Sequence, residues 1–355
     1  MRESTRSILA AGSMAPSGEN AQPWRFRVRE LDEAIEVDLI LETKADVSLY
    51  NHKNRAAFVA LGAAAENMRI AATAHQLSTT ILPYTASTDE ALAARIIMQP
   101  AIIKKDLLSD HIKNRATNRK PFETAALKRE EIASLEHSST FPQVSVQIFE
   151  AQSIIKSLAH FGSTNEEIML GNQQLHDFFF SHVNWSHADD ERKRTGFFIK
   201  TLELPPPARI GFKVLRSWSR ARVLNRILKF NRIVAGQNAS IYAKASAYGV
   251  ISADDDSLES AFMVGRAFER VWLEATAMGL QFQPLMGTLF LAYALREKAA
   301  GLSTDESSLI QSRYEALKTI VAPHKRVVLA LFRVGRGKPP SARALRKPLE
   351  DLIVN

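Results

Sequence analysis

The sequence predicts an α+β fold with an internal duplication. Short segments of alternating apolar residues, typical of strands, are separated by longer segments with helical periodicity. In addition, residues 265–280 align without gaps on residues 62–77 and share a glycine, a glutamate, an Ala-Thr-Ala triplet and a final leucine. Chance similarity between two alanine-rich helices is the alternative, but the gapless agreement favours an internal duplication.

The elements are expected in the following order. Helices are predicted at 4–12, 57–76, 128–135, 152–171, 265–280 and 306–321, and strands at 25–28, 37–41, 79–84, 96–98, 144–149 and 326–335. The helix at 57–76 carries alanine and glycine on every face, so another helix can approach it closely. We therefore expect it to be central and buried.

Composition restricts the classes of function. The 355 residues are enough for two ordinary domains, and the absence of cysteine excludes disulfides, thiolate metal sites and cysteine nucleophiles. No stretch approaches the length of a membrane span, and the apolar run 8–11 is too short for a signal peptide, so a cytoplasmic location is expected. A net charge of +8 favours anionic ligands or surfaces.

The loop at 15–24, with the sequence Ala-Pro-Ser-Gly-Glu-Asn-Ala-Gln-Pro-Trp, is the segment most suggestive of a ligand. Its prolines, glycine and asparagine specify a rigid, non-repetitive turn. Such a turn can direct main-chain N–H groups, together with Ser17 and Asn20, at a flat polar ligand. The alternative is an ordinary loop between a helix and a strand.

A basic segment at 111–122 contains Arg115, Thr117 and Arg119. Two arginines on either side of a hydroxyl are suited to phosphate, because the guanidinium group binds phosphate oxygens in a bidentate manner. A solvated basic helix end is the alternative. His176, His182 and His187 lack the spacing of metal ligands, and no metal site is expected.

We interpret residues 186–248 as an insertion. It holds the apolar group 197–199, three prolines at 205–207 and a basic amphipathic stretch at 209–232 that predicts a helix. Three interpretations remain open for this stretch: a helix packed on its own domain, a lid over a ligand pocket, and a face that binds a membrane surface or nucleic acid.

Together these segments resemble the FMN-dependent nitroreductase family over nearly the whole chain. Pro16 to Trp24 is similar to its P-S-x-x-N-x-Q-P-W loop, and Arg115-x-Thr117-x-Arg119 is similar to its R-x-S-x-[KR] start. Pro284-Leu285-Met286-Gly287 is similar to its P-[IL]-x-G segment, and 346–351 to its R-x-P-L-E-[ED] end.

The features are divided between the halves of the chain. The first half, 1–106, has the P-S-G-x-N loop, whereas the second, 107–355, has the arginine start and the R-x-P-L-E end. The family is a homodimer with FMN at two subunit interfaces. The resemblance therefore implies a single-chain pseudo-dimer of the Acg-like branch: two fused half-units, each with a central, mostly antiparallel sheet flanked by helices, around a helical interface. It also implies that one flavin site is kept and that the 186–248 insertion covers it.

The resemblance also implies roles for individual residues. Arg115, Thr117 and Arg346 would hold the FMN phosphate, and Arg119 would lie near the pyrimidine end of the ring. Ser17 and Asn20 would bond polar atoms of the ring and ribityl chain, and Gly287 would bring its backbone N–H to flavin N5 as the catalytic position. The full set of implied cofactor contacts is Pro16, Ser17, Gly18, Asn20, Arg115, Thr117, Arg119, Pro284, Leu285, Met286, Gly287 and Arg346.

The resemblance leaves two functions open. The first is an FMN-dependent oxidoreductase that transfers hydride to a small-molecule acceptor, with NAD(P)H as an optional donor. The second is an FMN-binding or FMN-sequestering protein without turnover, which the departure at Met286 from the common P-I-E-G and the bulky insertion favour. We expect no nucleic-acid partner, no stable membrane insertion and a monomer, with higher oligomers left open.

Overall fold

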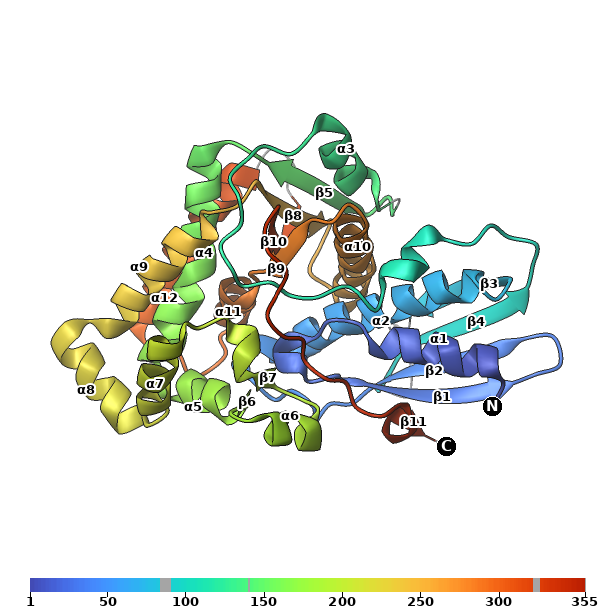
Figure 1. Cartoon of the computed structure of the whole chain (residues 1–355), viewed down its shortest axis with the longest axis horizontal. Helices are drawn as coiled ribbons and strands as arrows, with labels where there is room; N and C mark the ends of the chain where they lie inside the picture. Colours follow the sequence, from blue (N-terminus) through green and yellow to red (C-terminus); the bar gives the residue numbers. More distant parts are fainter. Residues whose placement is uncertain (84–90, 140, 322–325, 355) are drawn as a thin grey trace.

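Two sheets and a central pair of helices organise the molecule (Figure 1). The computed structural model describes residues 1–83, 91–139, 141–321 and 326–354. The five-stranded sheet has the order β11-β1-β2-β4-β3, and the four-stranded sheet has the order β5-β8-β10-β9. Every pairing in these sheets is antiparallel except β1 with β11. The α+β architecture of two sheet-centred halves, predicted from the sequence, is confirmed.

The strands of the larger sheet are β1 (Trp24–Glu30), β2 (Ile35–Leu41), β3 (Leu77–Pro83), β4 (Leu92–Pro100) and β11 (Ile353–Val354). Those of the smaller sheet are β5 (Val144–Phe149), β8 (Ala247–Ala253), β9 (Gln281–Pro284) and β10 (Val327–Gly335). A third, parallel pair joins β6 (Val183–Asn184) and β7 (Phe197–Phe198). The strand expected at 79–84 is β3, and Tyr84 lies outside the described residues.

Helices α2 (Arg55–Thr73) and α10 (Leu258–Ala277) cross at the centre of the molecule (Figure 1). Every residue of α2 is buried except Arg69, which is half-buried. The small side chains of this helix explain its burial, because they let α10 approach the α2 backbone. These two helices carry the repeat detected in the sequence, and α2 is as central and buried as predicted.

The remaining helices surround this centre. They are α1 (Glu3–Ser13), α3 (Arg129–His137), α4 (Gln152–Gly171), α5 (Gln173–Ser181), α6 (His187–Lys193), α7 (Pro206–Leu215), α8 (Trp218–Leu228), α9 (Phe230–Tyr242), α11 (Gly287–Arg296) and α12 (Thr304–Val321). Short 3-10 turns are η1 (Gly18–Asn20), η2 (Leu49–Asn54), η3 (Leu107–His111), η4 (Ile199–Leu202) and η5 (Leu349–Leu352). None of the described helices is long and apolar enough to cross a membrane.

The prediction of one basic helix at 209–232 is wrong. This stretch belongs to three helices, α7, α8 and α9, because Ser217 is extended and Lys229 adopts a left-handed conformation with φ of 52°. The apolar residues of this stretch do not all face the interior. Ala221 is buried, whereas Ile210 and Leu228 are 71% and 54% exposed.

The C-terminal segment returns to the first half of the molecule. After β10 it runs past the centre of the structure to the edge of the larger sheet (Figure 1). There Phe26 pairs with Ile353, and Arg27 pairs with Val354. This path carries Arg346 to the loop between α1 and β1.

Candidate functional site

The loop between α1 and β1 has an unusual backbone. Glu19, Asn20 and Gln22 all have positive φ, at 46°, 54° and 56°, although none is glycine. Such conformations are uncommon for residues with a side chain and persist only where the surroundings hold them. The Ser17 Oγ helps by accepting a hydrogen bond of 3.0 Å from the Gln22 backbone N–H. Pro16 and Ser17 are half-buried and Gly18 is exposed.

Side chains of this loop bind two distant parts of the chain. Asn20 donates from Nδ2 to the carbonyl oxygen of Leu345 at 2.9 Å. Gln22 donates from Nε2 to the Arg194 carbonyl at 2.7 Å and accepts from the Lys347 backbone N–H at 2.8 Å. The loop is thereby fixed to the C-terminal segment and to the segment after α6.

Arg115 and Arg346 converge on the same loop. Arg346 donates to Asn20 Oδ1 at 2.8 Å and to the Ala15 carbonyl at 3.1 Å. Arg115 donates to the carbonyl of the preceding residue, Met14, at 2.7 Å. Two of the arginines that the sequence predicted as phosphate ligands therefore lie together, although more than two hundred residues separate them.

Positive charge exceeds negative charge at this point. Arg115 is 6% exposed, lies over the Trp272 ring at 4.3 Å and has its Nε 3.1 Å from Glu269 Oε1. Burial and the neighbouring charge of Arg115 lower the pKa of Arg346 to about 9, against the opposing effect of Glu269. Arg346 Nε is buried with no hydrogen-bond partner among the described residues. The pair could therefore accept an anion, which would relieve the repulsion and occupy the free donor.

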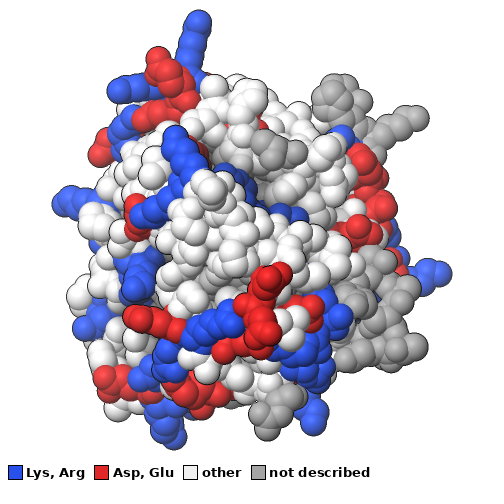
Figure 2. All heavy atoms as spheres, turned by 90° about the vertical axis from the view of Figure 1, so that its right-hand side faces the viewer, with Lys and Arg blue, Asp and Glu red and all other residues white. Residues whose placement is uncertain are grey.

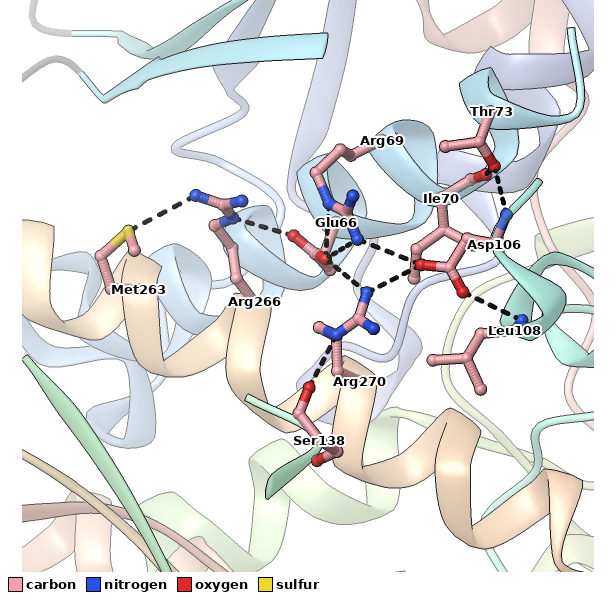
Figure 3. A network of polar contacts seen from close by, with 10 residues as sticks. All are labelled: Glu66, Arg69, Ile70, Thr73, Asp106, Leu108, Ser138, Met263, Arg266 and Arg270. Atoms are coloured by element: carbon pink, nitrogen blue, oxygen red, sulfur yellow. Dashed lines mark hydrogen bonds and ion pairs between the residues drawn. The ribbon is translucent and has the colours of Figure 1, made fainter. Parts of the chain in front are cut away.

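The corresponding position in the first half differs in how its arginines are paired. Glu66, the counterpart of Glu269 in the repeat, is fully buried and contacts Arg69, Arg266 and Arg270 (Figure 3). Asp106 joins the same network through Arg69 and Arg270, at 3.3 and 3.0 Å. In the repeat, Arg270 corresponds to Asn67, which carries no charge. The two sides differ in pairing: each arginine around Glu66 has a carboxylate partner, whereas Arg346 has none among the described residues.

Thr117 and Arg119 follow Arg115 in the chain, and each contacts a different part of the structure. Thr117 forms a parallel bridge with Phe282, next to the Asn118 N–H, which donates to the Phe282 carbonyl at 2.9 Å. Arg119 donates to the Thr201 carbonyl at 3.0 Å and lies 5.2 Å from the centre of the Phe197 ring. Thus Arg119 points towards the 186–248 segment rather than to the Arg115–Arg346 pair.

Sequence reasoning missed a group of acidic and phenolic side chains around Arg119. Tyr242 donates its hydroxyl to Glu166 Oε1 at 2.8 Å, and Glu166 Oε2 is buried without a hydrogen-bond partner among the described residues. Burial raises the pKa of Glu166 to about 7, although Tyr242 and Arg119 act to lower it. Burial and the charge of Asp46 raise the pKa of Glu19 to about 8, with Arg119 opposing them. Glu166 lies in a helix of ordinary pattern, so the sequence carried no signal for it.

The segment 284–287 begins α11 beside Glu166. Pro284 ends β9, Leu285 is buried and Met286 is half-buried against the core. A Cβ atom at Gly287 would lie 2.3 Å from Asn165 Oδ1, so a larger residue there would displace the Asn165 side chain. Asn165 immediately precedes Glu166 in α4, so Gly287 lies beside the part of α4 that carries Glu166. Among the described residues, no group of three or more His, Cys, Asp and Glu could hold a metal ion.

The segment from Arg194 to Thr201 packs against the loop between α1 and β1 and against Arg119 and Arg346. Gly196 donates its N–H to the Glu19 carbonyl at 2.9 Å, and Arg194 donates to the Arg346 carbonyl at 3.3 Å. With the contacts of Gln22 and Arg119 given above, this segment bridges the loop, the C-terminal segment and the acidic group.

Comparison with known proteins gives the following similarities. No protein-family profile matches the chain. It is 24% identical over 355 residues to the uncharacterized protein MT1398 of Mycobacterium tuberculosis, covering 97% of this chain and 47% of that protein. The chain thus spans about half the length of this curated relative.

Similar solved structures include a nitroreductase with bound FMN from Desulfitobacterium hafniense (TM-score 0.38, 10% identity, 70% of this chain and 98% of that chain). A BluB-like flavoprotein from Clostridium difficile has a TM-score of 0.38, 12% identity and coverage of 70% and 99%. The FMN-dependent nitroreductase NfnB of Mycobacterium smegmatis, in complex with NADPH, has a TM-score of 0.36, 14% identity and coverage of 69% and 96%.

Proposed function

We propose that the protein is an FMN-binding oxidoreductase of the nitroreductase type, organised as a single-chain pseudo-dimer like the Acg branch. The observation that carries this proposal is the convergence of Arg115 and Arg346 on one backbone loop, with one buried carboxylate between two cations. A phosphate group is the anion that best matches two guanidinium groups at one position.

The surrounding residues fit the rest of such a cofactor. Arg115, Thr117 and Arg346 would hold the phosphate, and the loop residues Pro16 to Asn20 would contact the ring and ribityl chain. The buried, unpartnered Arg346 Nε is the feature that supports this assignment. FMN, when bound, supplies the redox chemistry as a hydride carrier.

The protein groups would supply charge, proton handling and exclusion of water. Arg119 places a cation between Glu19 and Glu166, and its charge acts on both carboxyl groups. Glu166, with a pKa raised to about 7 and a hydrogen bond from Tyr242, can hold or release a proton near neutral pH. The segment 194–201 covers the loop and limits access of solvent.

A second candidate function is FMN sequestration without turnover. Four contacts of the 194–201 segment favour it, because they fix this segment on Glu19, Gln22, Arg119 and Arg346. Such a cover would retain the cofactor but impede NAD(P)H and acceptors. Met286 also occupies the position of the glutamate in P-I-E-G.

Visible absorbance of the purified protein tests cofactor binding. We expect a flavin spectrum in the parent and a loss of FMN affinity of roughly 1.5–3 kcal/mol in Arg346→Ala, since a charge-assisted contact is removed. Arg6→Ala is the matched control, because Arg6 forms an exposed ion pair with Glu350. Equal flavin content in Arg346→Ala and the parent would refute the phosphate assignment. Anaerobic titration of the yellow protein with NADPH then separates the two functions, since only an oxidoreductase that uses this donor is bleached.

We also propose that the halves comprise 1–106 and 107–355, with the insertion at 186–248, and that one chain forms a whole site in the cytoplasm. Dilution tests the second point. Flavin retention should not depend on protein concentration, whereas release at low concentration would indicate a site shared between two chains.

A further inference from the structure

Helices α7, α8 and α9 carry the net charge of the protein. Residues 206–242 contain eight lysines and arginines and no aspartate or glutamate, which leaves 38 basic and 38 acidic residues elsewhere. Arg232 forms an ion pair with Glu167 at 3.2 Å. No carboxylate of the described chain pairs with the other seven cations, which are Arg209, Lys213, Arg216, Arg220, Arg222, Arg226 and Lys229. The +8 charge is thus confined to one end of the molecule.

The same helices expose large aliphatic side chains. Ile210 and Val214, one turn apart on α7, are 71% and 42% exposed, and Val223 and Ile227, one turn apart on α8, are 52% and 70% exposed. Val214, Val223 and Leu224 line one shallow groove between the two helices together with Arg220. The four exposed residues therefore form one apolar strip across α7 and α8.

This strip is not needed to attach the two helices to the rest of the protein. Leu215 and Ala221 are buried on the opposite side, where His176 Nε2 contacts the Leu215 carbonyl at 2.8 Å. The His176 ring also lies 5.2 Å from the ring of Trp218, and Asn225 donates to the Leu170 carbonyl at 2.6 Å. The inner side is thus anchored, and the strip stays free.

The strip lies at an outer end of the molecule. α7 and α8 project beyond α4 and α5 at the side remote from β3 and β4 (Figure 1). Figure 2 shows the opposite end, where acidic and basic side chains are interspersed. The tip differs from that end by having one sign of charge around an apolar centre.

We propose that the α7–α8 tip docks on an anionic lipid surface. The aliphatic strip would enter the headgroup region while the surrounding cations meet lipid phosphates, which is the arrangement by which amphipathic helices bind membranes peripherally. Charge complementarity selects this occupant. A second copy of the chain would bring eight more cations against the tip, and nucleic acid would leave the isoleucines and valines in water. The flavin proposal plays no part in this inference.

Co-sedimentation of the full chain with vesicles tests the proposal. We expect binding to vesicles in which about a third of the lipid is phosphatidylglycerol, and none to pure phosphatidylcholine. Raising the ionic strength from about 0.05 M to about 0.5 M should weaken the binding strongly, because surface charges are screened. No sedimentation with the anionic vesicles at low salt would overturn the proposal.

Two variants separate the contributions. Arg220→Glu/Arg222→Glu/Arg226→Glu should lower the partition coefficient by at least about 100-fold, since each cation near the surface contributes independently. Ile210→Ser/Val223→Ser/Ile227→Ser should lower it by at least about tenfold with unchanged charge. Lys104→Glu/Arg129→Glu/Lys156→Glu, at exposed positions outside the tip, is the charge-matched control and should bind better than the Arg220/Arg222/Arg226 variant.

Other occupants give different results. Unchanged binding of the serine variant would overturn insertion of the strip. Tighter binding of an oligonucleotide than of vesicles would assign the tip to nucleic acid, and self-association in sedimentation velocity that the serine variant abolishes would assign it to a second copy. Circular dichroism of each variant establishes that the fold is retained.

Discussion

Gly62 and Gly265 make the same contact in opposite directions. A Cβ atom on Gly62 would lie 1.9 Å from the carbonyl oxygen of Phe262, and one on Gly265 would lie 2.0 Å from that of Val59. Gly62 corresponds to Gly265 in the repeat, and Val59 and Phe262 each lie three residues before these glycines. Each helix thus presents its glycine to the equivalent turn of the other, which is the reciprocal pattern of a two-fold interface, here within one chain.

Substitution of either glycine by alanine should destabilise the protein by a similar amount. We expect a loss of roughly 1–3 kcal/mol or more for Gly62→Ala and for Gly265→Ala, because the methyl group meets a backbone carbonyl that cannot rotate away. Unfolding in urea measures the change. The double variant should cost less than the sum, since separation of the helices relieves both clashes together.

Gly236→Ala is the control for that experiment. Gly236 lies within α9, and a Cβ atom there would meet nothing within 4 Å. Alanine should therefore stabilise the protein by about 0.4–1 kcal/mol, through lower chain entropy and better helix propensity. A similar loss at all three glycines would argue against the close approach of α2 and α10.

The buried pair of Arg115 and Glu269 predicts a rescue. Glu269 is fully buried, so Arg115→Met should leave an uncompensated carboxylate and cost about 3–5 kcal/mol. Addition of Glu269→Gln should recover most of this loss, whereas Arg6→Met should cost less than about 1 kcal/mol because its ion pair is exposed. Urea unfolding of the cofactor-free protein separates this effect from flavin binding, and failure of the second change to rescue would contradict it.

The raised pKa values of Glu19 and Glu166 predict that stability falls as pH rises. Between their usual value of 4.5 and the folded values of about 8 and about 7, the folded chain binds more protons than the unfolded chain. The contribution of these two groups to the free energy of unfolding is therefore fully present below pH 4.5. It is lost as the pH rises from 4.5 through the folded values of about 7 and about 8. Glu166→Gln should flatten the slope up to about pH 7, and Tyr242→Phe should extend it to higher pH by removing a hydrogen bond that favours the ionised form. Thermal melts across this range measure both effects.

Asp106 has the opposite dependence. Burial would raise the pKa of Asp106, but the hydrogen bond and charge of Arg270 outweigh it and hold the pKa below 3.8. Its contribution is present above that value and disappears as pH falls through the lowered pKa. Asp106→Asn should therefore be less stable than the parent near neutral pH, and the difference should narrow on acidification. A difference that stays constant down to about pH 3 would contradict this.

Much of the fold could be predicted because its signals are local or repeated. The α10 helix was found through its match to α2, and α4 coincides with its predicted bounds because the apolar period runs unbroken from Gln152 to Gly171. The division of the basic segment was missed at Ser217 and Lys229, since neither proline nor glycine marks the two breaks. The helices end there through backbone conformations that the residue types at these two positions do not predict.

The candidate site was predicted only in part. Arg115, Arg346 and Asn20, all candidate residues from the sequence, come together in the structure. Glu166 and Tyr242 were not predicted, because their position near Arg119 depends on tertiary packing between α4, α9 and a loop. Nor could the sequence indicate that the Met14 and Ala15 carbonyls, rather than side chains alone, would receive the two arginines.

The pairing of β11 with β1 joins residues more than three hundred positions apart. Because such long-range contacts form after local ones, the first sheet should acquire its outer strand late in folding. The same docking brings Arg346 to Asn20, so the proposed anion site and the sheet edge are completed together. Local release of residues 345–354 would then disrupt the proposed binding site while α2, α10 and the rest of both sheets stay folded. Ligand affinity could therefore change at this C-terminal segment independently of global stability.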